Sequence, residues 1–526
     1  MLKKMLLSGG AIVAASSLYA ESRPNIVFIL ADDMGLGDVS GINPNAKVKT
    51  PNLDSLMTEG MTFMNAHTSS SVCTPSRYGV MTGRYAWRSK LKARVLTGYS
   101  PSMIPKDRST VASMLKEKGY NTALIGKWHL GMDWQKKDGS TFKELKSKLS
   151  SEELEEQIDF SKPIKLGPVQ LGFDYYFGIA ASWDMVPYAF IENDHLISTD
   201  LVKFKGGVLP VEPEEVQSAR AAGVSKKELK KIMDKYPKRV WRGGYKAKGI
   251  KPTDALPKFA EKAQEYIANY DSDKPFFMYI PTPSPHTPVV PGDEFRGKSE
   301  AGLYGDYVQE TDWFVGTVIK ALKDKGIFEN TLVVFSTDNG YSVKAFPKAQ
   351  QAKYKHNPSY IYAGAKTSLT EGGHRVPFIA TWPKVIKPNT KNDDLVSLMD
   401  FYATCAELVG YEIPDNTAED SISFLGELNG NAKSKRTSLV HQSFAGYLGI
   451  TQGDWKLMFS KRKSPILVNF KEDLTEKHNL ARKNPEKAEE LKNLLIKIIK
   501  DGRSTPGTPQ KNDTPNDWEQ ISFMNK

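Results

Sequence analysis

The chain has 526 residues, of which 40% are hydrophobic and 25% are charged, and its formal net charge is +11 at pH 7. These fractions are typical of a folded globular protein and exclude a disordered or fibrous one. The two cysteines exclude a scaffold held together by several disulfides. No stretch approaches the ~18 consecutive apolar residues of a membrane span, so we expect no span.

The N-terminus has the pattern of a secretory signal peptide. Lys3 and Lys4 precede a mildly apolar stretch that ends in small residues at Ala20. We therefore expect residues 1–20 to be removed and the protein to be exported, either to a periplasm or to the medium.

Apolar runs alternate with helical patterns over the first 400 residues. The runs at 26–30, 122–125, 276–280, 332–335 and 376–381 predict buried strands. Helices are predicted from Pro51 onward, at 109–119 and at about 306–325. This alternation predicts an α/β catalytic domain at 21–400, with a large, mainly parallel sheet covered by helices on both faces.

One segment, residues 226–251, carries eleven Lys and Arg residues and only two acidic ones. Ser225 and Glu228 form the capping-box pattern that opens a short helix. Two interpretations remain open: a solvated surface helix and loop, or a basic rim that attracts a polyanion. No nucleic-acid motif accompanies the charge, so we do not expect a nucleic acid as partner.

The pattern changes beyond residue 400. Short strand-like pieces at 438–441 and 455–459 precede a strong helix at 485–500. We expect a smaller C-terminal α+β subdomain over 401–526, an antiparallel sheet plus a helix, which ends in a loosely held tail.

Polar residues follow four of the predicted strands. They are Asp32, Asp33, Lys127, His129, His286, Asp338 and Asn339. Each one alone has a structural explanation as a cap, a turn or a buried hydrogen bond. Because ligands of parallel sheets bind beyond the carboxyl ends of the strands, we expect these residues to share one site. Three carboxylates and an amide oxygen suit a hard divalent cation, Ca²⁺ or Mg²⁺.

Cys73 lies between a serine run and Pro75, with Arg77 four residues later. The Cys-x-Pro-Ser-Arg pattern of residues 73–77, continued by Gly83 and Arg84, resembles the segment in which sulfatases convert a cysteine to formylglycine. Cys405 lies in an apolar helical context instead, and we expect it in the core.

The resemblance to the type I, formylglycine-dependent sulfatases of the alkaline-phosphatase-like superfamily covers most of the chain. Matching segments occur in order at 24–33, 126–131, 285–288 and 338–340, and Lys366 precedes the Glu-Gly-Gly of 371–373. It implies a sulfatase fold, and we expect a bacterial carbohydrate sulfatase, an arylsulfatase-like sulfuric ester hydrolase.

The resemblance also implies roles for these residues. The aldehyde hydrate made from Cys73 has two hydroxyls, one that attacks sulfur and one that expels the sulfate. One Ca²⁺, rather than Mg²⁺, is held by Asp32, Asp33, Asp338, Asn339 and the modified Cys73. The catalytic side chains are Arg77 at the hydrate, Lys127 at the sulfate, His129 as base, and His286 and Lys366 at the leaving oxygen. Either His286 or Lys366 is the general acid, and a formylglycine-generating maturation enzyme is an implied partner.

The predicted signal peptide and the basic segment favour a sulfated polysaccharide or oligosaccharide, and we expect removal of sulfate from a chain end. Candidate sugar contacts, each of which could equally be packing, are Arg84, Trp87, Arg88, Trp183, Asp184 and His195. Two alternatives remain open: a phosphomonoester or phosphonate-ester hydrolase of the same superfamily, and a cation-dependent glycan-binding protein with an unmodified Cys73.

Overall fold

A computed structural model describes residues 23–525 except residues 146, 209–212, 238–239 and 462–463. The predicted signal peptide lies outside the described residues. Within them, no helix combines the length and the apolar character that crossing a membrane requires.

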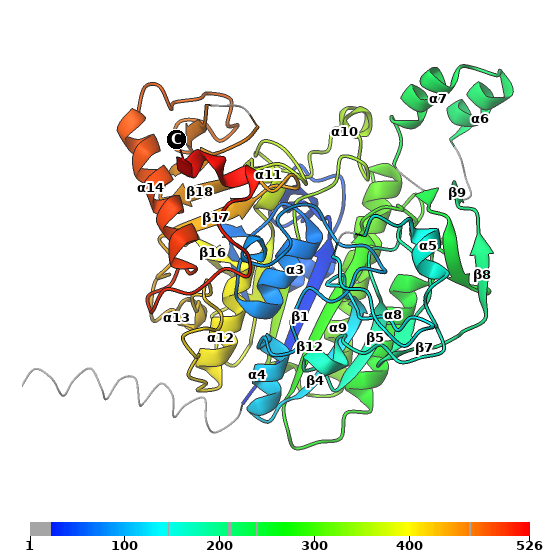
Figure 1. Ribbon diagram of the computed structural model, residues 1–526, viewed down its shortest axis with the longest axis horizontal. Coiled ribbons are helices and arrows are strands. Elements are labelled where there is room, and N and C mark those ends of the chain that lie inside the picture. The colour runs from blue at the N-terminus through cyan, green and yellow to red at the C-terminus, as the bar shows by residue number, and fades with distance from the viewer. Residues whose placement is uncertain (1–22, 146, 209–212, 238–239, 462–463, 526) are drawn as a thin grey trace, which may run out of the picture.

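A ten-stranded sheet forms the centre of the molecule (Figure 1). Its middle strands run parallel, in the order β13, β1, β12, β4 and β5. Their bounds are β1 Asn25–Asp32, β4 Asn121–Lys127, β5 Tyr175–Ile179, β12 Phe276–Pro285 and β13 Thr331–Thr337. The apolar residues of β1 are fully buried on both faces, which requires cover on both sides of the sheet.

The outer strands make the sheet mixed. On one side β15 (Thr390–Asn392), β2 (Met61–Phe63) and β14 (Phe378–Thr381) follow β13, and β14 runs antiparallel to it. On the other side β6 (Ile191–Glu192) and β7 (His195–Leu196) extend β5 in antiparallel fashion. The prediction of a large, mainly parallel sheet is confirmed, and the run at 376–381 is an antiparallel member of it.

Two groups of helices cover the sheet (Figure 1). In one group α2 (Pro51–Glu59) and α8 (Ala255–Ala268) pack against α9 (Gly302–Asp324). In the other group α3 (Cys73–Thr82) and α4 (Val111–Glu117) pack against α12 (Phe401–Leu408). Cys405 of α12 is fully buried, as expected.

A smaller antiparallel sheet of four strands follows in the C-terminal part, with α14 (Pro485–Asp501) beside it. The strands are β17 Ser438–Gln442, β18 Leu448–Gln452, β19 Trp455–Met458 and β20 Ile466–Asn469. Leu491, Leu495 and Ile499 of α14 share a core with apolar residues of this sheet. The predicted antiparallel sheet plus helix is therefore confirmed, while the proposed domain boundary at residue 400 stays a prediction.

The last residues do not form the loosely held tail that their composition suggests. The ring of Phe523 stacks on Phe459 with centroids 3.9 Å apart, and Ile521 is buried in the same core as α14. The side chain of Asn512 accepts a hydrogen bond from Arg88 at 3.1 Å. Tertiary contacts hold this segment although its own sequence has little structural preference.

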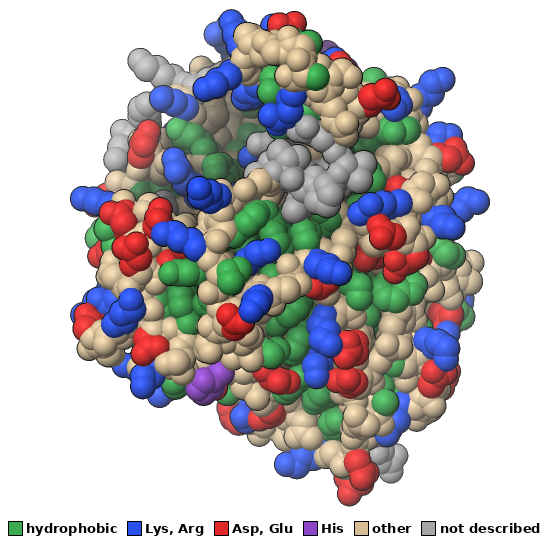
Figure 2. Space-filling view, turned by 90° about the vertical axis from the view of Figure 1, so that its right-hand side faces the viewer, with side chains coloured by type: hydrophobic (Ala, Val, Ile, Leu, Met, Phe, Trp, Pro, Cys, Tyr) green, Lys and Arg blue, Asp and Glu red, His purple; other side chains and the backbone are tan. Residues whose placement is uncertain are grey.

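The helices α6 (Glu214–Ala221) and α7 (Lys226–Met233) pack on each other and project from the body of the molecule (Figure 1). Helix α7 begins at the predicted cap, where the hydroxyl of Ser225 accepts a hydrogen bond from the Glu228 N–H at 3.2 Å. It has no buried residue. On the face shown in Figure 2, basic and acidic side chains are interspersed.

Candidate active site

The carboxyl ends of four parallel strands deliver the predicted polar residues to one edge of the sheet. Strand β1 ends at Asp32, β4 ends at Lys127, β12 leads into His286, and β13 leads into Asp338. Their side chains lie within contact distance of one another although up to about 300 residues separate them in the chain.

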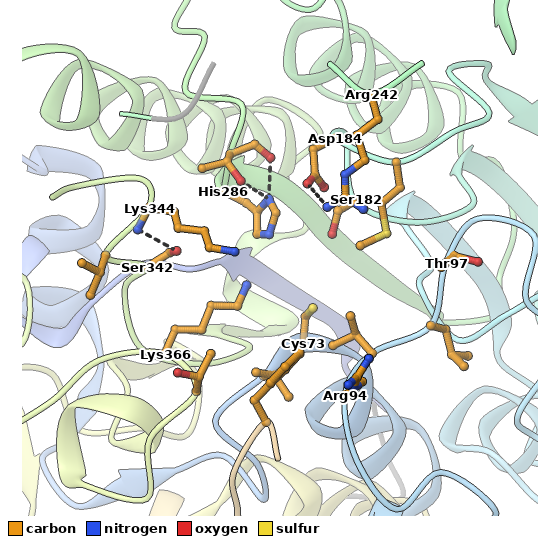
Figure 3. Close-up of a pocket in the computed structure, with 18 residues that line it drawn as sticks. Cys73, Arg94, Thr97, Ser182, Asp184, Arg242, His286, Ser342, Lys344 and Lys366 are labelled. Atoms are coloured by element: carbon orange, nitrogen blue, oxygen red, sulfur yellow. Dashed lines mark hydrogen bonds and ion pairs between the residues drawn. The ribbon is translucent and has the colours of Figure 1, made fainter. Parts of the chain in front are cut away.

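Cys73 is the first residue of α3, and Pro75 occupies the first turn of that helix, where a missing N–H costs nothing. The helix ends at Gly83, whose φ of +63° favours glycine and whose N–H donates to Gly79 O at 2.8 Å. Cys73 lines a cavity of about 580 Å³ together with His286 and Lys366 (Figure 3).

Two cations hold two of the acidic side chains. Arg77, fully buried, donates from Nε to Asp338 Oδ2 at 2.9 Å and also donates to the Lys127 carbonyl at 3.0 Å. Lys127 Nζ lies 2.5 Å from Asp32 Oδ2. Burial opposes ionisation of Asp32, but Lys127 and the neighbouring cations hold its pKa well below the usual value. Burial and the charge on Asp32 raise the pKa of Asp338 to about 7.

A second set of contacts surrounds Asp33. Its Oδ1 accepts hydrogen bonds from Lys366 Nζ at 2.5 Å and from Asn339 Nδ2 at 2.7 Å, and its Oδ2 lies 3.6 Å from His286 Nε2. Burial opposes the charge on Lys366, but Asp33 and other carboxylates outweigh it and raise the pKa of this ammonium group. His286 is fixed through Nδ1, which lies 2.5 Å from the Thr287 carbonyl.

The oxygens left over fit a divalent cation. Asp32 Oδ1, Asp33 Oδ2 and Asn339 Oδ1 are buried and have no hydrogen-bond partner among the described residues. A buried carboxylate oxygen without a partner is costly, and a hard cation that takes oxygen ligands removes that cost. Ligand atoms of Asp32, Cys73 and Asp338 also lie within 4.8 Å of one another. The residues present therefore fit the predicted metal site.

His129 has one free nitrogen. Its Nε2 donates to the Leu96 carbonyl at 2.9 Å, so Nδ1 carries the lone pair, and no described residue bonds to Nδ1. Burial and the charge of Lys127 hold the pKa of His129 well below its usual value, which keeps the ring neutral and able to accept a proton.

Three of the predicted sugar contacts do not reach the cavity. Arg84 and Arg88 are fully buried, and they pair with Glu419 at 3.3 Å and Asp420 at 2.7 Å. Trp87 is also buried, with the Arg88 guanidinium 4.3 Å from its ring centre. Internal carboxylates neutralise these two arginines, which also contact the C-terminal segment at Asp513 and Asn512.

Of the other three predicted sugar contacts, two lie outside the cavity lining and one lies in it. Trp183 is buried and donates from Nε1 to the Pro252 carbonyl at 2.8 Å, outside the cavity lining. His195 is exposed on β7, at the outer edge of the sheet, and pairs with Asp194 at 2.7 Å. Asp184 does line the cavity, where it pairs with Arg242 at 2.7 Å.

The cavity also contains residues that the sequence patterns did not single out. They are Arg94, Ser182, Arg242 and Lys344, all labelled in Figure 3. Arg242 belongs to the basic segment 226–251, whose charge is a signal that could have identified it. The others come from loops with no motif, and only tertiary structure brings them to the cavity.

A family model described as Sulfatase matches residues 24–411, which is most of the chain and includes every strand of the active-site edge. The chain belongs to the sulfatase family. A second model, described as N-sulphoglucosamine sulphohydrolase, C-terminal, matches residues 365–503.

Sulfatases of known activity support this assignment. The N-acetylgalactosamine-6-O-sulfatase of Bacteroides thetaiotaomicron is 33% identical over 90% of this chain and 93% of its own length. Human arylsulfatase A is 28% identical over 95% of this chain and 92% of its own. A 6S-sulfatase structure from work on glycosaminoglycan metabolism by B. thetaiotaomicron has a TM-score of 0.75 at 31% identity and covers 90% of this chain and 99% of that one. This sulfatase is therefore an enzyme that hydrolyses sulfate esters.

Proposed function

We propose that this sulfatase removes sulfate from the end of a sulfated carbohydrate, using a formylglycine derived from Cys73 and one bound Ca²⁺. The observation that carries the proposal is a convergence at one edge of the sheet, beside the cavity that Cys73, His286 and Lys366 line. Three buried oxygens without a hydrogen-bond partner among the described residues lie there together with two lysines and two histidines. When present, the cation and the aldehyde hydrate supply charge neutralisation at sulfate oxygens and two hydroxyls, one nucleophilic and one that expels the sulfate.

The chain's own residues divide the remaining work. Asp32, Asp33, Asp338 and Asn339 would hold the cation, with the modified Cys73 beside it. Arg77, fixed by Asp338, would orient the residue at position 73 from within its own helix. Lys127 and Lys366 would bind sulfate oxygens. Their ammonium groups contact Asp32 and Asp33, the carboxylates proposed to hold the cation, and therefore lie where the sulfate would bind.

The two histidines suit opposite proton transfers. His129 Nδ1, neutral and without a partner among the described residues, would accept the proton of the hydroxyl that expels sulfate. His286 lines the cavity, and its Nδ1–H is held by the Thr287 carbonyl. With Nδ1–H held in this way, His286 can give a proton from Nε2 only when the ring carries protons on both nitrogens, and Nε2 faces Asp33 Oδ2 at 3.6 Å. We assign the general acid to this doubly protonated His286, which would give its Nε2 proton to the leaving alcohol oxygen, and sulfate binding to Lys366.

A carbohydrate substrate is supported by two relatives, one named as an N-acetylgalactosamine-6-O-sulfatase and one solved in work on glycosaminoglycans. Asp184 and Arg242 form a paired carboxylate and guanidinium in the cavity wall, which suits the hydroxyls of a sugar ring. Exo action is tested by comparing a sulfated polymer with its oligosaccharides. If the enzyme released sulfate from the polymer as fast as from its oligosaccharides, exo action would be contradicted.

The nucleophile is tested by the intact mass of the peptide that carries Cys73, purified from a host competent for maturation. We expect a mass about 18 Da below that of the thiol, which corresponds to the aldehyde. Metal analysis of the same sample should give one calcium and no stoichiometric magnesium. An unshifted peptide, with no hydrolysis of 4-nitrophenyl sulfate, would favour the non-catalytic binding protein.

The phosphorus-directed alternative is tested separately, by rates on matched aryl sulfate, phosphate and phosphonate esters. We expect the sulfate to be the preferred substrate.

For export, we propose that residues 1–20 direct the chain to a periplasm or the medium, with N-terminal sequencing of the mature protein as the test. We also propose a formylglycine-generating enzyme as the maturation partner. Protein made in a host that lacks this enzyme should then keep the Cys73 thiol and contain no aldehyde.

A further inference from the structure

The cavity wall has more positive charge than negative charge. Arg94, Arg242 and Lys344 line it, together with a single carboxylate from Asp184 on the same wall. Arg242 is neutralised by Asp184 at 2.7 Å. The guanidinium of Arg94 has neither a hydrogen bond nor an ion pair with any residue in the described part of the chain.

The backbone of Arg94 is strained. Its φ of +71° is in the left-handed region, which costs a residue other than glycine about 1 kcal/mol or more. Such a conformation persists only where surrounding contacts impose it, and it is frequent at functional sites. Asp33, with φ of +67°, and His129, with φ of +56°, share it at the active-site edge of the sheet.

A chain of backbone hydrogen bonds imposes this conformation. The N–H of Arg94 donates to the Phe444 carbonyl at 2.8 Å, and the N–H of Phe444 donates to the Thr367 carbonyl at 3.2 Å. The N–H of Thr367 in turn donates to Ser71 O at 2.9 Å, two residues before Cys73. The position of Arg94 is therefore fixed relative to the nucleophile.

The turn between β17 and β18 contacts the loop that contains Lys92 and Arg94. A Cβ at Gly446, whose φ is +88°, would lie 2.3 Å from the Lys92 carbonyl oxygen, so glycine is required. Gln442 Nε2 donates to the same carbonyl at 2.8 Å. The C-terminal sheet thus holds an exposed, unneutralised arginine at the cavity.

We propose that Arg94 binds a second anionic group of the substrate. This inference rests on the proposed function, and it narrows the substrate class to sugars that carry a carboxylate or a further sulfate near the sulfate that is removed. A guanidinium binds either group through two parallel N–H donors. Figure 3 shows Arg94 and Lys344 on opposite sides of Cys73, so Arg94 is directed at a part of the substrate away from Lys344.

The test compares kcat/KM on matched substrates. They are 6-sulfated N-acetylgalactosamine, its 4,6-disulfate, a disaccharide in which the same sugar is linked to a uronate, and the carboxyl-reduced form of that disaccharide. We expect the wild type to favour at least one doubly anionic substrate by about tenfold, the effect of one charged hydrogen bond. The disulfate and the uronate arms distinguish the two anions.

The variants are Arg94→Met, Arg94→Lys and, as a matched control, Arg482→Met, which changes an exposed arginine outside the cavity lining. We expect Arg94→Met to abolish the preference, Arg94→Lys to retain part of it, and Arg482→Met to leave it intact. The loss in Arg94→Met should be about tenfold larger on the doubly anionic substrate than on 4-nitrophenyl sulfate. Equal losses on all substrates, or no preference in the wild type, would overturn the proposal.

Failure of the proposed function has a different signature, since the wild type would then hydrolyse none of the sulfated sugars. The second-anion inference is measured independently by calorimetric binding of the same sugars to Cys73→Ala, which has no nucleophile, and to Cys73→Ala/Arg94→Met. We expect tighter binding of a doubly anionic sugar to the first protein, and loss of that difference in the second. Identical binding to both proteins would overturn it.

Discussion

At Cys73, the proposed chemistry depends on a side chain with two hydroxyls rather than one. In Cys73→Ser, the single oxygen can accept the sulfuryl group but cannot expel it, because no second hydroxyl is present. We expect turnover to fall by at least about 10³-fold and the intact protein to gain about 80 Da, the mass of SO₃, after incubation with substrate. Full turnover by this variant would contradict the aldehyde mechanism.

The role of His286 is tested by the leaving group. A sugar alkoxide needs a proton as it departs, whereas 4-nitrophenolate does not. We expect His286→Gln to lower kcat by about 10²-fold or more on a sulfated sugar and by less than about tenfold on 4-nitrophenyl sulfate. Lys366→Met is the matched comparison, with similar losses on both substrates expected. The opposite pattern would make Lys366 the general acid.

Within α9, Glu310 is buried and accepts a hydrogen bond from the Gly292 N–H at 2.9 Å. Burial raises its pKa to about 8. The native state therefore keeps a proton that the unfolded chain releases above about pH 4.5, and this residue makes stability fall as the pH rises from 4.5 to 8.

We expect Glu310→Gln to raise the melting temperature at pH 8 and to leave it nearly unchanged at pH 4.5, because the amide resembles the protonated acid. Thermal unfolding of both proteins across this pH range is the measurement. A difference that shrinks as the pH rises would contradict the assignment.

One set of ion pairs joins the C-terminal sheet to helix α11 (Glu371–His374), which follows Lys366 in the chain. Lys456 of β19 lies 3.0 Å from Glu371, the first residue of α11, and 3.1 Å from Glu476. These groups are all buried. Lys456→Met would leave the buried Glu476 side chain without its cation and Glu371 with Arg375 at 2.7 Å, and we expect the free energy of unfolding to fall by about 3–5 kcal/mol.

The matched variant is Lys456→Met/Glu476→Gln, which removes one of those carboxylates and should recover part of the loss in denaturant unfolding. If the free energy of unfolding of Lys456→Met lay within about 1 kcal/mol of the wild-type value, the contacts of Lys456 with these carboxylates would contribute little to stability.

The elements also show what sequence can predict. The active-site edge followed from short apolar runs that end in Asp32, Lys127, His286 and Asp338, because parallel strands place their carboxyl ends together. From the sequence, Arg88 can be a sugar contact or a packing residue, because nothing local reveals its partner, Asp420, more than 300 residues away. Arg94 was missed because no motif surrounds it, and only the backbone contact of its loop with Phe444 brings it to the cavity.

For the whole molecule, the positive charge is unevenly placed. The exposed helix α7, with four lysines and one glutamate, opens the basic segment 226–251, which also contains Arg242 of the cavity wall. A basic projection near a cavity attracts polyanions over about a Debye length, ~10 Å at 0.1 M salt. Its charge should therefore act on association rate with a long substrate and not on the fold.

The test reverses exposed charges in α7, in the variant Lys226→Glu/Lys227→Glu/Lys231→Glu. We expect kcat/KM on a sulfated polysaccharide to fall several-fold at low ionic strength and to approach the wild-type value near 0.5 M salt, where screening is strong. Rates on 4-nitrophenyl sulfate and the melting temperature should stay the same, because these side chains touch neither the cavity nor the core. A loss on the polysaccharide that salt does not reduce would leave the solvated surface helix as the better interpretation of this segment.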